Sequence, residues 1–372
     1  MSGLVLGVDL CNEYTQVYSF AHDRGWGFPT VVLKKRAGSE WLSGEAAYEA
    51  ALAGAGTPVD RLVEMAIKNG TATIDQVKYS GVYLLQMFLR GALHSILKET
   101  GEKSVSRLVV ALPKLDPALM DNLLLICGEL GVGREDLHVI SHCESFLYFV
   151  LSQKREIWNN QTGMFDLSDG RLRYYEMKMR RGLRQMTILG EYEELEEKFN
   201  LDLIDTPSGS RLADRIMCNC GKRMLGKKLF SAVFLTGKGF NSLDWAPEWT
   251  KVVCDRRKVF QEPYLFAKGA AYNAADYDRE KTAYPYILLC DGRLDTSVTL
   301  KVTFARKEKQ LVLSAAGERW YEAKTTVDLI LDGQSDLDFS LTTEDGKKKR
   351  WQKIPLDGLP KRPDRATRIT LT

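Results

Sequence analysis

The sequence has no apolar run that approaches the roughly 20 residues of a membrane-spanning helix. Its 372 residues are 44% hydrophobic and 27% charged, with a mean hydropathy of −0.24. This composition excludes a disordered, collagen-like or membrane-embedded chain. The first ten residues carry no basic segment, and Asp9 interrupts their apolar run, which is not typical of a secretory signal. We therefore expect a cytoplasmic protein without a transmembrane segment.

The seven cysteines form no even, regularly spaced framework. Their odd number and scattered positions exclude a small secreted scaffold held together by disulfides. His138, His142 and Cys143 lie close in the sequence, as do Cys218 and Cys220. Neither group offers a second pair of ligands at usable spacing, and a zinc site needs three or four ligands. We interpret all five as structural residues.

Neither sign of charge dominates the chain. Residues 284–372 hold 16 basic and 13 acidic side chains and account for the whole net charge of +3, so residues 1–283 are neutral. A neutral main body argues against a protein that follows a phosphate backbone, and we expect no nucleic-acid partner. The basic segment 347–350 could serve an acidic partner or a membrane surface. We favour a hairpin tip and an edge strand protected by lysines.

Two successive segments repeat one pattern, in which three strands are followed by helices. Apolar residues recur at helical spacing most clearly over residues 82–98. The strands are predicted at 4–10, 15–21 and 30–35 in the first segment, and at 163–167, 172–179 and 186–192 in the second. The repetition predicts an α/β domain over residues 1–275, in two similar halves that meet near residue 160.

The character of the sequence changes after residues 276–283. About seven short strands follow at a spacing of roughly 8–12 residues, separated by Asp-Gly pairs. Such spacing with such turns is typical of an all-β sandwich. We predict that residues 284–372 form a β-sandwich domain.

Six short motifs in residues 1–275 occur in a familiar order. They are LGVDL at 6–10, WLSGEAA at 41–47, VVALP at 109–113, FDLSDG at 165–170, FLTGKGF at 234–240 and AKGAA at 267–271. Together they resemble the nucleotide-binding domain of the seventy-kilodalton heat-shock chaperones, within the superfamily of actin and the sugar kinases. The resemblance implies a two-lobed actin-like (ribonuclease H-like) ATPase-type domain, with lobe I at about 1–160 and lobe II at about 161–275.

The resemblance also implies a nucleotide site. In it Asp9 and Asp166 hold a hydrated Mg²⁺ ion over the phosphates of ATP or ADP, because carboxylate oxygens suit that ion. Asp166 and Glu144 are the implied catalytic residues, with Glu144 positioning the attacking water. The implied nucleotide contacts come from two phosphate hairpins, an adenosine loop and the closing helix: Gly7, Asp9, Cys11, Asn12, Ser168, Asp169, Gly170, Gly237, Lys238, Gly239 and Gly269.

Several of these positions depart from the family pattern. Cys11 and Asn12 stand where the first hairpin has its tip glycine and a threonine, and Lys238 replaces the middle glycine of the adenosine loop. Ser168 and Asp169 replace paired glycines, and the carboxylate of Asp169 would repel a polyphosphate. Losing one transition-state contact can cost several powers of ten in rate. The sequence therefore predicts little or no turnover, and it leaves open whether a nucleotide binds at all.

We therefore expect a pseudo-ATPase that works through a protein partner, as an adaptor or regulator. In its relatives the two lobes move when the cleft closes, and an attached domain reads the movement. Two alternatives stay open. One is an active, chaperone-like Mg-ATPase that uses Asn12 on a phosphate and Glu144 on a water. The other is an actin-like protein that polymerises or is recruited to a membrane.

Overall fold

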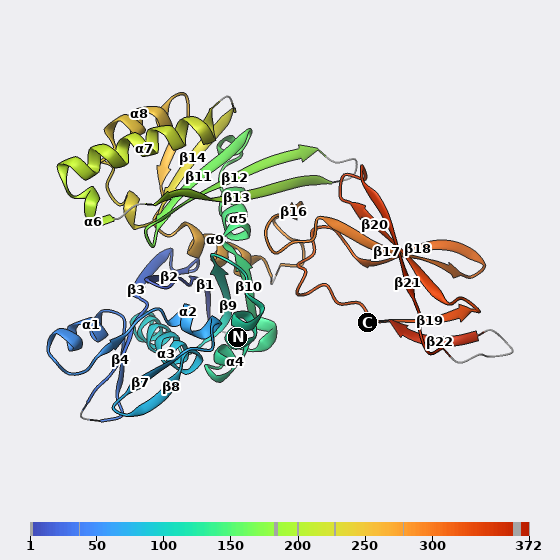
Figure 1. Ribbon diagram of the computed structural model, residues 1–372, viewed down its shortest axis with the longest axis horizontal. Helices are drawn as coiled ribbons and strands as arrows, with labels where there is room; N and C mark the ends of the chain where they lie inside the picture. Colours follow the sequence, from blue (N-terminus) through green and yellow to red (C-terminus); the bar gives the residue numbers. More distant parts are fainter. Residues whose placement is uncertain are drawn as a thin grey trace. The chain divides into compact units, whose positions relative to one another are not determined.

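The computed structural model describes residues 3–36, 38–181, 185–198, 201–226, 228–277, 279–359 and 366–371. The chain divides into two units (Figure 1). The first comprises Met1–Lys178 and Glu191–Tyr284, and the second comprises Met179–Gly190 and Pro285–Thr372. Of the helices within the described ranges, none combines the length and the apolar composition that a membrane span requires.

A five-stranded sheet forms the centre of residues 3–160, which are called lobe I below, as residues 161–275 are called lobe II. Its strands are β1 (Leu4–Asp9), β2 (Tyr14–Ser19), β3 (Arg24–Pro29), β9 (Val105–Leu112) and β10 (Leu137–Ser141). They lie in the order β3-β2-β1-β9-β10, with β1, β9 and β10 parallel and β2 antiparallel to both of its neighbours. The central strands are almost continuously apolar and buried, as expected of parallel strands covered on both faces.

The third strand of this sheet is β3, so the prediction that residues 30–35 form it was wrong. Two glycines weaken the strand pattern of β3 in the sequence, because glycine disfavours strands. Both glycines make room for a ring. A Cβ atom on Gly25 would lie 2.8 Å from the ring of Tyr264, and one on Gly27 would lie 2.4 Å from the hydroxyl of Tyr14.

A second sheet forms the centre of lobe II. Its strands are β11 (Gln161–Ser168), β12 (Arg171–Arg181), β13 (Met186–Lys198), β14 (Phe230–Thr236), β15 (Lys258–Gln261) and β16 (Ile287–Leu289). The order is β15-β14-β11-β12-β13-β16. β11 is antiparallel to β12 and parallel to β14, which is parallel to β15. The first five strands of this sheet therefore repeat the order of the first sheet, in agreement with the repetition seen in the sequence.

Two helices lie side by side between the sheets (Figure 1): α5 (His142–Leu151) and α9 (Leu265–Asp276). α5 packs on the second sheet, where the rings of Phe146 and Tyr175 have centroids 6.1 Å apart. α9 packs on β1, where a Cβ atom on Gly7 would lie 2.2 Å from the carbonyl oxygen of Ala267. Each helix thus bridges one sheet to the other helix.

The outer part of lobe I consists of short strands and four helices. They are β4 (Val32–Lys34), β5 (Trp41–Ser43), β6 (Pro58–Val59), β7 (Thr71–Ile74), β8 (Val77–Ser80), α1 (Glu45–Leu52), α2 (Leu62–Ile67), α3 (Gly81–Thr100) and α4 (Pro117–Glu129). α3 confirms the helix predicted over residues 82–98. The side chain of Ser80 accepts a hydrogen bond from the backbone N–H of Tyr83 at its start, and Gly101 ends it with φ 75°.

The outer helices of lobe II are α6 (Leu201–Ile204), α7 (Pro207–Leu225) and α8 (Pro247–Cys254). α7 and α8 cover one face of the second sheet (Figure 1), and Trp249 of α8 is fully buried against Phe165 of β11. Asp214 of α7 fixes the start of α8, because its carboxylate accepts hydrogen bonds from the backbone N–H groups of Glu248 and Trp249 at 3.0 and 2.7 Å.

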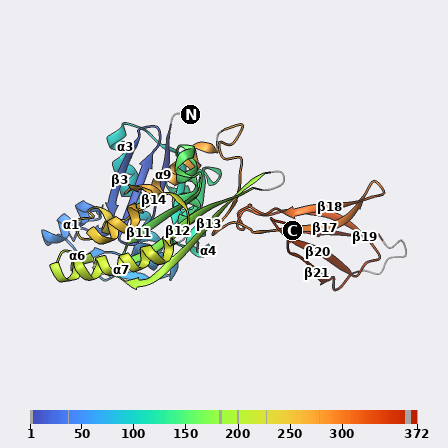
Figure 2. The ribbon, with the colours of Figure 1, turned by 90° about the horizontal axis from the view of Figure 1, so that it is seen from above.

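The second unit consists mainly of strands. They are β17 (Thr296–Phe304), β18 (Lys307–Ser314), β19 (Val327–Asp332), β20 (Asp336–Thr343), β21 (Lys349–Pro355) and β22 (Ala366–Leu371) (Figure 2). The sheet β18-β17-β20-β21 and the pair β19-β22 share one apolar core, formed by Leu300, Leu331, Leu337 and Phe339. β21 is an exposed edge strand with several basic side chains, in agreement with the interpretation of that segment.

The tip of the β12–β13 hairpin belongs to the second unit. Thr187 of β13 pairs with Ile287 of β16. Within the described residues, β16 therefore belongs to the second sheet and not to the sheets formed by β17–β22. The carboxylate of Glu344 accepts a hydrogen bond from Thr187 Oγ1 at 2.5 Å and is ion-paired with Arg180 of β12. Both contacts of Glu344 therefore lie within the second unit.

Candidate functional site

The two aspartates predicted to hold a metal lie at equivalent ends of the two sheets. Asp9 ends β1 and pairs with Ala111 of β9, whereas Asp166 lies near the end of β11 and pairs with Thr236 of β14. Both are buried. The carboxyl ends of central parallel strands are where open α/β sheets place their ligands. That both aspartates face a ligand cleft stays a prediction.

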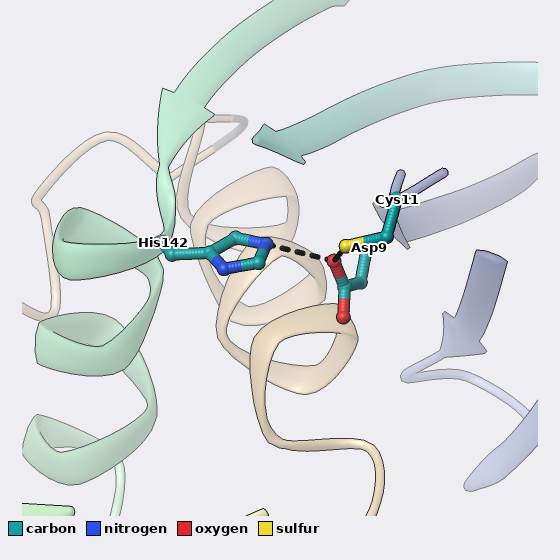
Figure 3. Close-up of side chains that lie close together, drawn as sticks. All are labelled: Asp9, Cys11 and His142. Carbon is teal, nitrogen blue, oxygen red and sulfur yellow. Dashed lines mark hydrogen bonds and ion pairs between the residues drawn. The ribbon is translucent and has the colours of Figure 1, made fainter. Parts of the chain in front are cut away.

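The carboxylate of Asp9 is engaged by two side chains of its own chain (Figure 3). Its Oδ1 atom lies 2.8 Å from Nε2 of His142 and accepts a hydrogen bond from the Cys11 thiol at 3.2 Å. Burial, followed by the charge of Asp9, raises the pKa of Cys11 well above its usual range. Cys11 is therefore a protonated thiol at neutral pH.

His142 is the first residue of α5, immediately after β10. Ser141 begins the helix, with its hydroxyl accepting a hydrogen bond from the backbone N–H of Glu144 at 3.1 Å. The imidazole ring of His142 stacks on Phe266 of α9, with centroids 3.7 Å apart and planes at 15°. Phe266 therefore fixes the plane of the ring that meets Asp9. Glu144 lies in the same turn and is fully buried.

Asp166 is also engaged by its own chain. Its Oδ2 atom lies 3.0 Å from Nη1 of Arg173, and its Oδ1 atom accepts a hydrogen bond from Ser168 Oγ at 2.5 Å. Burial raises the pKa of Asp166, and the charge of Arg173 with the Ser168 hydrogen bond opposes that rise. The guanidinium keeps its charge at any physiological pH, so it favours the ionised form of the Asp166 carboxylate.

The β11–β12 hairpin is closed by a two-residue turn at Asp169 and Gly170. Both residues have positive φ, 53° and 65°, and Ser168 pairs with Arg171 across the turn. Two left-handed residues are the mark of a type I′ turn, for which Asp-Gly is a favoured pair. Although Ser168 and Asp169 replace the paired glycines of the family pattern, the hairpin is still tight. The side chain at its tip is the carboxylate of Asp169.

Asp169 lies in acidic surroundings. Burial, followed by the charge of Glu13, raises the pKa of Asp169 to about 6, with further contributions from Asp166 and Asp9 that the charge of Arg173 partly offsets. Near neutral pH the tip is therefore largely ionised but easily protonated. It contributes negative charge next to the two aspartates.

Asn12 has a structural partner. Its Oδ1 atom accepts a hydrogen bond from the backbone N–H of Glu64 at 2.9 Å, in the first turn of α2. The four N–H groups at the start of a helix need such partners. Arg61, immediately before α2, has a left-handed φ of 52°. Asn12 thus ties the first hairpin to α2, and a contact between Asn12 and a phosphate stays a prediction.

Gly7 and Gly269 lie where backbones pack closely. A Cβ atom on Gly7 would lie 2.2 Å from the backbone N of Ala271, and one on Gly269 would lie 2.0 Å from the carbonyl oxygen of Ser145. Real Cβ atoms do not approach so closely, so both positions require glycine for the packing of α9 on β1 and α5. This packing accounts for both glycines, and their contact with a nucleotide stays a prediction.

The predicted adenosine loop rests on the end of β11. Gly237 has a φ of 93°, and a Cβ atom there would lie 2.5 Å from the carbonyl oxygen of Leu167. A Cβ atom on Gly239 would lie 2.4 Å from the Leu167 side chain. Lys238, between them, is exposed. The loop therefore lies next to Ser168 and the second hairpin, and its contact with a nucleotide stays a prediction.

The sequence reasoning missed Arg173, although a signal was present. A two-residue turn at Asp169-Gly170 sets the register of the hairpin, and that register places residue 173 opposite residue 166. It also missed Tyr175, which follows Arg173 on the same face of β12, because alternate residues of a strand share a face. The Tyr175 hydroxyl is buried, without a hydrogen-bond partner among the described residues.

The comparisons with known proteins give families and no activity. Residues 13–291 match the model of the family of unknown function (DUF5716) C-terminal, and the chain belongs to this family. Residues 293–372 match a domain of unknown function (DUF8552). No curated protein matches the chain. The border between the two matches falls between β16 and β17.

Proposed function

We propose that this member of the DUF5716 family is a cytoplasmic protein of the actin and heat-shock-chaperone ATPase type, with degenerate phosphate loops. It acts as a pseudo-ATPase, an adaptor or regulator that works through protein contacts. The repeated strand order of the two sheets, with α5 and α9 between them, supports the first part of this proposal. Five of the six sequence motifs lie on these elements, and the sixth, WLSGEAA, lies on β5 and α1.

The ion pair of Asp166 and Arg173 carries the proposal. A hydrated Mg²⁺ ion over a nucleotide needs carboxylates that are free to accept its coordinated waters. Here the guanidinium supplies the positive charge that a metal would supply, and Ser168 occupies the second oxygen. Asp166 thus has the charge neutralisation and the hydrogen bonds that a metal ion would otherwise provide.

The other parts of the phosphate site are engaged in the same way. Asp9 is engaged by His142 and Cys11, and Asn12 by the start of α2. The tip residue Asp169 adds a negative charge where phosphate oxygens would lie. ATP hydrolysis by this superfamily's chemistry relies on the metal and on positioning. This arrangement favours a protein that keeps the fold of the ATPases and does not hydrolyse ATP.

The adaptor role is supported by the course of β12. This strand carries Arg173 in lobe II and Arg180 in the second unit, where Arg180 pairs with Glu344. A change at the Asp166–Arg173 pair would therefore act on a strand that is anchored in the second unit. We propose that this unit presents the surface read by a protein partner.

The test is phosphate release from Mg-ATP by the purified full chain, beside Asp166→Asn. We expect release by the wild type to be no faster than release by the variant. Arg171→Gln serves as the control, because Arg171 lies on the same strand in an exposed pair with Glu194. Mg²⁺-dependent release that Asp166→Asn abolishes and Arg171→Gln keeps would establish an active ATPase instead.

Binding is tested separately by thermal unfolding with Mg-ATP, with Mg-ADP and without ligand. A ligand at a hundred times its dissociation constant stabilises a protein by about 2.7 kcal/mol. We expect millimolar nucleotide to stabilise the protein by less than this amount, and so to raise its unfolding temperature less. A full shift in the absence of turnover would mean that the cleft is a nucleotide sensor.

A further inference from the structure

Three different donor types meet at the end of β1. The Asp9 carboxylate, the Cys11 thiol and the His142 imidazole each offer one atom, and these three atoms lie within 4.8 Å of one another. Asp9 and Cys11 are two residues apart, and His142 comes from the start of α5 (Figure 3). All three side chains are buried, with 7%, 8% and 2% of their surface exposed.

Oxygen, sulfur and nitrogen donors in one cluster select a particular class of ion. Mg²⁺ takes oxygen ligands almost exclusively, whereas Zn²⁺ and similar divalent transition metals accept thiolate, imidazole and carboxylate together. We propose that Asp9, Cys11 and His142 form a binding site for one divalent transition-metal ion of the Zn²⁺ type. Three protein ligands leave a fourth tetrahedral position for a water molecule.

The hydrogen bonds within the cluster define its state without metal. Nδ1 of His142 has no hydrogen-bond partner among the described residues, so we place a proton on Nε2, which donates it to Asp9. Cys11 likewise directs its thiol proton at Asp9. Both protons point at one oxygen, and a single cation can replace them.

Binding of the ion proceeds by proton exchange. The thiol proton leaves to solvent, and the imidazole proton moves from Nε2 to Nδ1 through solvent, so that sulfur and Nε2 each present a lone pair to the ion. The stacking of His142 on Phe266 already holds the ring in its plane. The resulting charge balance is neutral, because the thiolate and the carboxylate offset the two charges of the ion.

The inference does not depend on the proposed function. The nearby ion pair of Asp166 and Arg173 has its own hydrogen bonds, which involve neither Cys11 nor His142. A metal here would join the first hairpin to α5, whether or not the cleft binds a nucleotide.

The test uses Co²⁺ as a spectroscopic substitute for Zn²⁺ in chelator-treated full chain. We expect one equivalent of Co²⁺ to produce a sulfur-to-cobalt charge-transfer band, which Zn²⁺ removes by displacement and Mg²⁺ leaves unchanged. The band should be lost in Cys11→Ser. It should persist in Cys143→Ser, a buried neighbour of His142, and in Cys254→Ser, an exposed thiol. Absence of the band in the wild type, or an unchanged band in Cys11→Ser, would overturn the proposal.

A second measurement needs no variant. X-ray absorption of the wild type loaded with one equivalent of Zn²⁺ should show one sulfur neighbour at about 2.3 Å and nitrogen or oxygen neighbours at about 2.0–2.2 Å. A shell of nitrogen and oxygen alone would rule out Cys11 as a ligand and with it the site.

Discussion

Arg173 Nη1 lies 3.0 Å from Asp166 Oδ2, and the two side chains are 8% and 1% exposed. They face each other across one hairpin, because the turn at Asp169-Gly170 sets the register that pairs them. An ion pair this deeply buried is costly to form and more costly to break on one side only.

Replacing Arg173 by glutamine should destabilise the first unit strongly. The substitution leaves the Asp166 carboxylate buried without its charge partner, which typically costs about 3–5 kcal/mol. The free energy of unfolding, measured in urea by tryptophan fluorescence, checks this. A loss below about 0.5 kcal/mol would mean that the pair contributes nothing to the fold.

The double variant Asp166→Leu/Arg173→Met should recover most of that loss. Removing both charges leaves no unpaired group, and replacing a buried pair by apolar side chains is often neutral or stabilising. Comparison with the single variants Asp166→Leu and Arg173→Met in the same urea experiment isolates the coupling between the two residues. Additive losses would contradict a direct interaction between them.

Asp169 should make stability depend on pH in a defined direction. Its pKa is about 6 in the folded chain and 3.8 ordinarily, so the folded state holds the proton more tightly. Stability from this group is therefore fully present below pH 3.8 and is lost as the pH rises through 6. Asp169→Asn should remove this loss and stabilise the protein by about 1–3 kcal/mol at pH 7, with no gain near pH 3.5.

The measurement is thermal unfolding of the wild type and Asp169→Asn across pH 3.5–7. Asparagine tolerates the positive φ of this position, so the turn is preserved. Asp357→Asn is the matched control, because Asp357 is exposed and also precedes a glycine with positive φ. Parallel pH profiles for the wild type and Asp169→Asn would show that Asp169 titrates normally.

Gly269→Ala should disrupt the packing of the two central helices. The added methyl group would meet the carbonyl oxygen of Ser145 at 2.0 Å, and backbone cannot move aside cheaply. We expect a loss of at least about 2 kcal/mol. Gly128→Ala in α4 is the control, since its Cβ would meet nothing within 4 Å, and it should stabilise by about 0.5–1 kcal/mol. Equal effects of the two substitutions would refute the close crossing.

Glu344→Ala should loosen the tip of the β12–β13 hairpin within the second unit. The variant removes a carboxylate that both Arg180 and Thr187 contact, and a hydrogen bond to a charged group contributes about 1.5–3 kcal/mol. Amide hydrogen exchange in β16 should accelerate about ten- to hundredfold. Glu308→Ala, which removes an exposed pair with Lys301, should leave β16 unchanged. Unaltered exchange in Glu344→Ala would mean that other contacts hold the tip.

The sequence pattern predicted the local structure well where hydrophobic periodicity and turn residues agree. Residues 82–98 show the helical period, and the helix found there is capped by Ser80 and Gly101. β3 was misplaced because its glycines weaken the strand signal, and they are present for the rings of Tyr264 and Tyr14. The reason for those glycines lies in side chains that are distant along the chain or on another strand.

Some contacts within the candidate site likewise follow from the local sequence, and others depend on the tertiary structure. The pairing of Asp166 with Arg173 follows from a turn only three residues away, so the local sequence of the hairpin determines it. His142 lies 133 residues from Asp9, and no local pattern links them. Their contact depends on how α5 is placed after β10 and beside α9.

The sequence by itself determined several strands of both sheets, most of the helices and the register of the Asp169-Gly170 hairpin, because each depends on residues a few positions apart. Only the tertiary structure decided what Asp9 contacts and why Gly269 must be glycine. Those answers depend on the approach of distant segments, which local propensity does not encode. The aspartates were recognisable in the sequence, and the side chains that engage them became evident once the two sheets and the helices between them were in place.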